Sequence, residues 1–208
     1  LRFAPHVEWL PATAAEPPAP LRVLAEGKAS AERARLGVSF DLRPYGQRGV
    51  AARLVADRPH GGVARQWFRS PDVLALLPFD RPQPGNSYGL VWSLPDERAA
   101  ELLRLDPAAF EATLNEATGG AAGRLALAGE RAAWPLALGR ASRVHGAGWV
   151  LVGDCAHVVH PLAEQGVNLG LRDVAGLRDM VREARQRRQD WTAPHRLQSP
   201  NGQGIEQR

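Results

Sequence analysis

Residues 149–173 constrain the fold of this chain more than any other segment. The apolar run at 149–152 suits a buried strand, and the sequence Gly-Asp-Cys-Ala-His follows it directly at 153–157. A helical pattern of apolar residues begins after Gly166. A strand, a glycine turn and a helix start in this order are typical of α/β sheets, which bind ligands beyond the carboxyl ends of their strands. The segment therefore predicts a ligand site.

Each residue type in this segment has a physical role at such a site. Gly153 removes the side chain where the strand turns, and Asp154 offers a short acceptor for sugar-type hydroxyls. Pro161 stiffens the loop that follows. From Gly166 on, the unpaired N–H groups of a helix start favour negative charge on a ligand.

The whole run, GDCAHVVHPLAEQGVNLGLRD, resembles the motif G-D-A-A-H-x-x-x-P-x-x-G-Q-G-x-N-x-G-x-x-D of single-component FAD-dependent aromatic hydroxylases. The resemblance implies that Asp154 binds the ribityl chain of FAD. It also implies that the helix start at Gly166, Val167 and Asn168 faces the pyrimidine edge of the flavin. Gly153 and Pro161 complete the cofactor-binding set expected of this motif.

Two positions depart from the family pattern. Cys155 replaces a small alanine, and Glu164 stands where the family has glycine. A carboxylate at that place is expected to repel the phosphates of FAD or a reduced flavin, or to clash if the family's glycine uses a positive φ angle. The histidines at 157 and 160 have no Cys, Asp or Glu at metal-ligand spacing, so we expect no metal site. No side chain is identified as a catalytic acid, base or nucleophile.

A second element upstream, at residues 23–33, resembles the family motif D-G-x-x-S-x-x-R, with Glu26 in the aspartate position. In the family this motif lies near the FAD pyrophosphate and the path of the nicotinamide cofactor. The resemblance implies that Gly27, Ser30 and Arg33 line the same cleft, with Gly27 and Arg33 binding cofactor. The alternative is a strand followed by a solvated, charged helix.

Alternating apolar patterns and turn residues predict an antiparallel sheet between the two motifs, with strands at 49–56, 62–68, 73–79 and 88–93. Helices are expected at 95–105 and 107–117, and a long helix from 167 with Val174, Leu177, Val181 and Ala184 on its apolar face. The short segments at 45–47, 66–68, 77–78, 91–93 and 134–136 resemble sequences of the ubiquinone-biosynthesis hydroxylase branch. Trp67, Trp92 and Trp134 are alternatively core residues.

We therefore expect an α/β (α+β) fold, in which a partial FAD-binding Rossmann-like domain carries an inserted, mostly antiparallel substrate domain. The expected boundaries are 1–37 and 141–190 for the FAD-binding part, 38–140 for the substrate domain and 191–208 for a tail. No G-x-G-x-x-G follows a strand near the N-terminus, so truncation at both ends and loss of the ADP-binding unit are expected.

The resemblance leaves two functions open. One is an FAD-dependent monooxygenase that hydroxylates an aromatic ring, such as a polyprenylated ubiquinone precursor, with NAD(P)H and oxygen. The other is a truncated, non-catalytic fragment that acts at most as a substrate-domain or partner-binding module. Yellow colour after purification favours the first, and an unchanged spectrum and melting temperature on adding FAD favours the second.

Composition limits the partners. The chain of 208 residues carries a net charge of +4 and one cysteine, which excludes an internal disulfide and suits the cytoplasm. No apolar run approaches the roughly 20 residues of a membrane span. The basic stretch at 182–188 is expected to be a solvated helix end, with peripheral contact at the inner membrane face as the alternative. No nucleic-acid motif accompanies it. Expected partners are an aromatic or quinone-precursor molecule and proteins of a biosynthetic complex.

Overall fold

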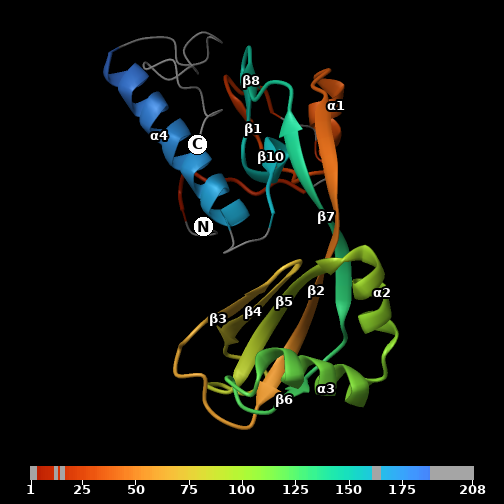
Figure 1. Ribbon diagram of the computed structural model, residues 1–208. Helices are drawn as coiled ribbons and strands as arrows, with labels where there is room; N and C mark the ends of the chain where they lie inside the picture. The colour runs from red at the N-terminus through yellow and green to blue at the C-terminus, as the bar shows by residue number, and fades with distance from the viewer. Residues whose placement is uncertain (1–3, 12–13, 15–16, 161–164, 188–208) are drawn as a thin grey trace.

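The computed structural model of the protein describes residues 4–11, 14, 17–160 and 165–187. The strands are β1 (Arg22–Leu24), β2 (Phe40–Ala56), β3 (Arg65–Arg69), β4 (Asp72–Phe79), β5 (Ser87–Pro95), β6 (Leu125–Leu127), β7 (Ala132–Ala141), β8 (His145–Gly146), β9 (Trp149–Leu151) and β10 (His157–Val158). The helices are α1 (Ala31–Arg35), α2 (Asp96–Arg104), α3 (Pro107–Thr118), α4 (Gln165–Gln186) and a short 3₁₀ helix, η1 (Gly153–Cys155). Figure 1 shows two lobes joined by the long strands β2 and β7. The expected residues Pro161 and Glu164 and the tail at 191–208 lie outside the described residues.

The lower lobe in Figure 1 is built on an antiparallel sheet, as the sequence predicts. The strand order of this sheet is β10-β7-β2-β5-β4-β3, with β6 paired to β2, and the sheet continues along β2 and β7 into the upper lobe, where β10 lies. Strand β2 begins at Phe40, nine residues before the predicted start at Gly49, because its first part pairs with β7 up to Ala141. Strand β3 begins later than predicted, since Gly61 and Gly62 have positive φ angles of 59° and 73° and form the preceding turn.

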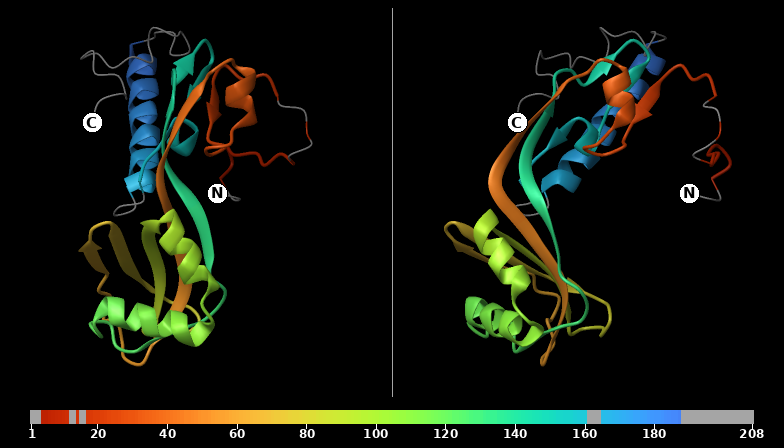
Figure 2. Two further views of the ribbon diagram at one scale, coloured as in Figure 1. Left: turned by 45° about the vertical axis from the view of Figure 1, so that its right-hand side comes forward. Right: turned by 90° about the vertical axis from the view of Figure 1, so that its right-hand side faces the viewer.

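The helices α2 and α3 cover one face of this sheet (Figure 2). The side chain of Asp106 accepts a hydrogen bond from the N–H of Ala109, Pro107 starts α3, and Gly119 ends it in the left-handed conformation. Beneath these helices lies a core of fully buried side chains that includes Val50, Leu54, Leu76, Leu90, Leu94, Phe110 and Leu114. Trp92 belongs to this core at 2% exposure, whereas Trp134 is 43% exposed. The core interpretation is therefore right for Trp92 and wrong for Trp134.

The upper lobe contains a small sheet in which β1 pairs with β9 in parallel and β8 with β9 in antiparallel. Its core includes Leu24, Val38, Trp149, Leu151 and Cys155. The predicted domain boundaries lie close to the start of β2 at Phe40 and the end of β7 at Ala141, and they stay predictions.

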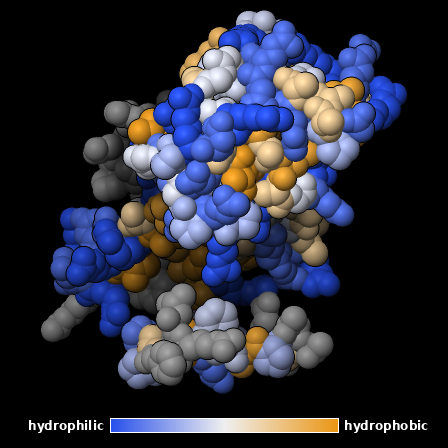
Figure 3. Space-filling view, turned by 90° about the horizontal axis from the view of Figure 1, so that it is seen from below, coloured by the Kyte–Doolittle hydropathy of each residue, from blue (hydrophilic) through white to orange (hydrophobic). Residues whose placement is uncertain are grey.

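Helix α4 packs against the small sheet through Leu177, which contacts Val150. The prediction that Val174 lies on the buried face is wrong, since this side chain is 52% exposed, and Ala184 is buried as predicted. Arg182, Arg185 and Arg187 are exposed, as expected of a solvated helix end. Within the described residues, no helix is long and apolar enough to cross a membrane. The surface seen from below is mostly hydrophilic, with smaller apolar patches (Figure 3).

Candidate functional site

The predicted ligand segment begins where β9 ends and η1 starts. Gly153 has a φ of +61°, a left-handed conformation that a side chain would strain. Gly170 of α4 lies directly against it, since a Cβ on Gly170 would stand 3.4 Å from the Cα of Gly153. The two glycines thus let α4 approach the turn after β9 more closely than residues with side chains would allow.

A buried carboxylate holds α4 against the turn after β9. Oδ2 of Asp173, in α4, accepts a hydrogen bond of 2.8 Å from the backbone N–H of Gly153. The same oxygen lies 2.8 Å from Nε2 of His157. Asp173 is only 6% exposed. The last residue of the motif therefore holds the first one in place, a role that the sequence analysis did not assign to Asp173.

The ion pair shifts the titration of the histidine. The hydrogen bond that His157 donates to the carboxylate of Asp173 raises the pKa of His157 above its ordinary value of 6.5, against the opposing effect of burial. Because the folded state raises this pKa, the stabilisation from His157 is fully present below pH 6.5 and is lost as the pH rises through the raised pKa.

We predict that this pH dependence of stability depends on His157. In urea unfolding at a series of pH values, the free energy of unfolding of the wild type should fall above about pH 6.5 relative to His157→Gln. Glutamine keeps a donor toward Asp173 without titrating in this range. The difference between the two proteins removes the contribution of other groups, such as His160, whose pKa burial lowers. A difference that stays constant with pH would contradict the prediction.

The predicted flavin-binding residues that the structure describes gather at one place. Asp154 is exposed in η1, and a Cβ on Gly166 would stand 3.9 Å from its Oδ1. Val167 and Asn168 are exposed in the first turn of α4, Val167 at 67%. The first N–H groups of a helix have no partner within it. An exposed carboxylate and a helix start thus lie side by side, a pairing of hydroxyl acceptor and anion-stabilising donors.

The upstream motif lies against the same turn, and Arg33 makes the connection. Arg33 is 6% exposed, and its Nη1 donates to the carbonyl of Cys155 at 2.9 Å. Its Nη2 donates to the carbonyl of Lys28 at 2.7 Å, and its guanidinium lies 3.9 Å from the ring centre of Phe40. Arg33 therefore holds two loops together from within, so the solvated interpretation is wrong for this residue.

The rest of the upstream motif is ordered by its own side chains. Oγ of Ser30 accepts from the N–H of Arg33 at 3.0 Å and caps α1, while its hydroxyl donates to the carboxylate of Glu26. Gly27, with φ of +77°, makes the turn before the helix. Glu26 thus supplies the acceptor at the position where the family has aspartate. Its side chain is one methylene longer than that of aspartate, and its carboxylate still accepts the hydrogen bond from Ser30.

One contact joins the two lobes and was not predicted. Nε2 of His160 lies 3.1 Å from Oε1 of Gln47, and Nε2 of Gln47 donates to the carbonyl of Pro71 at 3.2 Å. The ring of Tyr45 meets His160 edge to face, with centroids 5.1 Å apart. Gly46, with φ of +67°, lies at the break in register of β2 between Pro44 and Gln47. The side chains on both sides of Gly46, Tyr45 and Gln47, contact His160. The segment at 45–47 stands out in the sequence only by its family resemblance, which does not predict this contact.

Comparison with known proteins identifies the family. The FAD binding domain family matches residues 19–189. The chain belongs to this family. Its described site residues fit FAD, because Asp154 presents an exposed carboxylate beside the first turn of α4, where the backbone N–H groups have no partner within the helix. FAD is the cofactor of the family. Within the described residues, no group of three His, Cys, Asp or Glu side chains is arranged for a metal.

The relatives confirm the expected branch. Ubiquinone hydroxylase UbiL of Rhodospirillum rubrum is 35% identical over 174 residues, which are 84% of this chain and 40% of the relative. The 3-demethoxyubiquinol 3-hydroxylase of Escherichia coli is 32% identical over 178 residues, covering 84% of this chain and 44% of the relative. The chain thus spans about two fifths of the length of these relatives.

Solved structures confirm the fold. PqsL, a probable FAD-dependent monooxygenase from Pseudomonas aeruginosa, superposes with a TM-score of 0.62 at 23% identity, covering 80% of this chain and 46% of that one. The flavin-dependent halogenase CmlS superposes with a TM-score of 0.61 at 16% identity, over 79% and 30% of the two chains. The likeness supports an α/β fold with an inserted antiparallel sheet.

Proposed function

We propose that the chain supplies the flavin-ring side and the substrate lobe of an FAD-dependent monooxygenase that hydroxylates an aromatic ring of a ubiquinone precursor. The observation that carries the proposal is the exposed Asp154 carboxylate beside the open start of α4. FAD, when bound, supplies the redox chemistry with NAD(P)H and oxygen as co-substrates. Ubiquinone hydroxylases among the relatives support the substrate class.

The residues of this chain bind and orient the cofactor. The Asp154 carboxylate accepts hydrogen bonds from ribityl hydroxyls, and the backbone N–H groups at the start of α4 stabilise negative charge on the flavin ring. Asp173 and Arg33 fix the turn at 153–155 from behind, through Gly153 N–H and the Cys155 carbonyl.

The face of the large sheet opposite α2 and α3 is the proposed platform for the aromatic ring. Opposite residues of neighbouring strands share a face, and one such row across the sheet contains Trp134, Gly49, Ser93, Val73 and Phe68. These positions alternate with the core residues under α2 and α3, so they lie on the other face.

Two observations support the view that this face lies toward the upper lobe. Gln47, two residues before Gly49 on β2, reaches His160 of the upper lobe. In Figures 1 and 2 the strands β3, β4 and β5 lie below the first turns of α4. Half-buried apolar side chains on the face, Val73, Ala75, Leu77 and Val91, suit an aromatic ring and a prenyl tail and exclude water.

The proposal is tested by FAD binding to the chain and its Asp154→Ala variant. We expect the wild type to quench FAD fluorescence and the variant to bind about tenfold more weakly, since a charged acceptor contributes about 1.5 kcal/mol. The control is Asp80→Ala, an exposed carboxylate after β4. Equal affinity of all three proteins, or no binding by any of them, would contradict the proposed site. Hydroxylated product from a prenylated phenol with NAD(P)H and oxygen tests the activity itself.

A further inference from the structure

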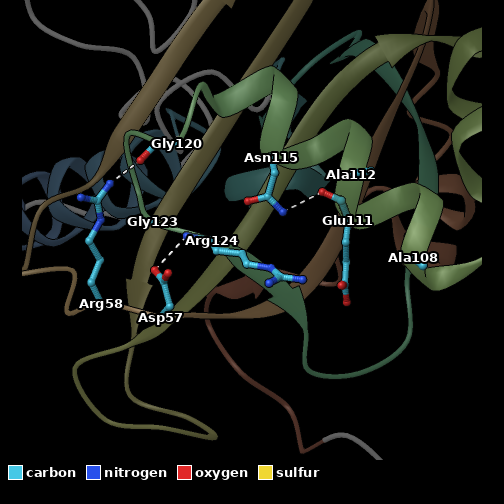
Figure 4. A pocket seen from close by; sticks show the side chains of 9 residues that line it. All are labelled: Asp57, Arg58, Ala108, Glu111, Ala112, Asn115, Gly120, Gly123 and Arg124. Carbon is cyan, nitrogen blue, oxygen red and sulfur yellow. Dashed lines mark hydrogen bonds between the residues drawn. The ribbon is translucent and has the colours of Figure 1, made fainter.

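A hollow lies in the lower lobe, at the end of β2 that is remote from Asp154. This hollow of about 720 Å³ opens between α3 and the chain that leaves β2 (Figure 4). Helix α3 contributes Glu111 and Asn115, and the opposite side is formed by Asp57, Arg58 and Arg124. Pockets that bind small molecules have volumes of roughly 300–1,000 Å³.

Hydrogen bonds to the backbone fix the walls. Nδ2 of Asn115 donates to the carbonyl of Leu125 at 2.8 Å, and its Oδ1 accepts from the N–H of Leu125 at 2.8 Å. Oδ1 of Asp57 accepts from the N–H of Arg124 at 2.8 Å. Because one side chain matches both backbone groups of Leu125, the distance between α3 and the opposite wall is set by the fold.

Gly123 shows how closely the wall is built. A Cβ there would stand 2.3 Å from Oδ1 of Asp57 and 2.7 Å from Cγ of Arg58, and its φ is +84°. Only glycine permits this approach. The side chains of Asp57 and Arg58 therefore lie directly over the backbone of the loop, with Arg58 donating to the carbonyl of Gly120.

The charged groups of the hollow differ in whether they already have hydrogen-bond partners within the protein. Oε1 of Glu111 already accepts from the N–H of Leu127 at 2.8 Å. The guanidinium of Arg124 has no hydrogen bond or ion pair to any residue that the structure describes. Figure 4 shows it extended across the hollow toward the Glu111 side, while Arg58 is turned toward Gly120. A free guanidinium thus faces open space that small residues, Ala108, Ala112 and Gly120, leave unfilled.

We infer that this hollow binds a small polyhydroxylated anion, a sugar phosphate or a sugar acid. Arg124 provides the planar fork of donors that phosphate and carboxylate groups prefer. The carboxylates of Asp57 and Glu111 repel a second anionic group but accept hydrogen bonds from hydroxyls. No aromatic side chain lines the hollow among the described residues, which distinguishes it from the apolar sheet face. The site is independent of the proposed oxygenase function.

Isothermal titration calorimetry of the chain at physiological salt tests the inference with three probes. Glucose 6-phosphate and gluconate carry the anionic group, and neutral glucose lacks it. We expect at least one anionic probe to bind and glucose to bind at least tenfold more weakly. Binding of the phosphate alone assigns a sugar phosphate, and binding of gluconate alone assigns a sugar acid.

Matched variants locate the binding. Arg124→Gln should weaken the bound probe at least tenfold, and Glu111→Gln, which keeps the acceptor for Leu127, should weaken it less. Arg104→Gln removes the same charge from an exposed position at the end of α2 and should leave affinity within twofold. Unchanged melting temperatures show that the variants are folded. A dissociation constant weaker than about 10 mM for both anions, or equal binding by Arg124→Gln, overturns the inference.

Discussion

Replacing Asp173 by alanine should lower the free energy of unfolding by about 3 kcal/mol, because the change leaves buried partners without their carboxylate. His157 and the N–H of Gly153 both lose their acceptor, Oδ2 of Asp173. Urea unfolding at about pH 6, below the ordinary histidine pKa, measures the loss where the pair contributes most.

Two variants separate this effect from a general loss of charge on α4. Asp173→Asn keeps an acceptor for Gly153 but no charge, so its loss should be intermediate. Asp179→Ala removes an exposed carboxylate of the same helix, whose side chain is 62% exposed in a pair with Arg178. Surface pairs contribute about 0–1 kcal/mol, so this variant should stay near wild type. If Asp173→Ala were no less stable than Asp179→Ala, the buried anchor would be refuted.

Replacing Arg33 by alanine should also cost about 3 kcal/mol, since it removes two hydrogen bonds of a buried guanidinium and its contact with Phe40. The carbonyls of Cys155 and Lys28 would lose their donors. Hydrogen exchange should show the effect as faster exchange at 153–157 and at 28–33, while the sheet core around Leu90 keeps its protection.

Arg33→Lys and Arg35→Ala are the comparisons for this variant. Lysine keeps the charge but cannot hold both carbonyls in the geometry of the guanidinium, so we expect a loss between wild type and alanine. Arg35 lies on the same helix with its side chain 77% exposed, and its removal should change stability by less than about 0.5 kcal/mol. Equal unfolding free energies for Arg33→Ala and Arg35→Ala would show that the buried contacts contribute nothing.

The sequence predicted β4, β5, α2 and α3 of the lower lobe because their signals are local, whereas β6 and β7 were not predicted. The break before Val73, the Asp106–Pro107 start of α3 and its end at Gly119 each depend on neighbouring residues. The start of β2 at Phe40 was missed, because that half of the strand is stabilised by pairing with β7, almost a hundred residues later.

In the candidate site, too, local features were predicted and features that depend on distant residues were not. The spacing of the motif placed Asp154, Gly166, Val167 and Asn168 at one strand end and helix start, and the structure brings them together. Their role in binding FAD stays a prediction, as does that of Gly27 and Arg33. The exposure of Val174 could not be predicted, since helical periodicity gives a face but not the position of its neighbours.

The sequence by itself determined the family and the turn at Gly153, because these follow from residue types at fixed spacings along the chain. Only the tertiary structure decided that Asp173 and Arg33 hold that turn from two sides, that Gln47 reaches His160, and that Arg124 faces an open hollow. Asp173 and Gly153 are 20 residues apart along the chain, Gln47 and His160 113, and Arg33 and Cys155 122. Such contacts depend on how strands pair and helices pack, which no local pattern records.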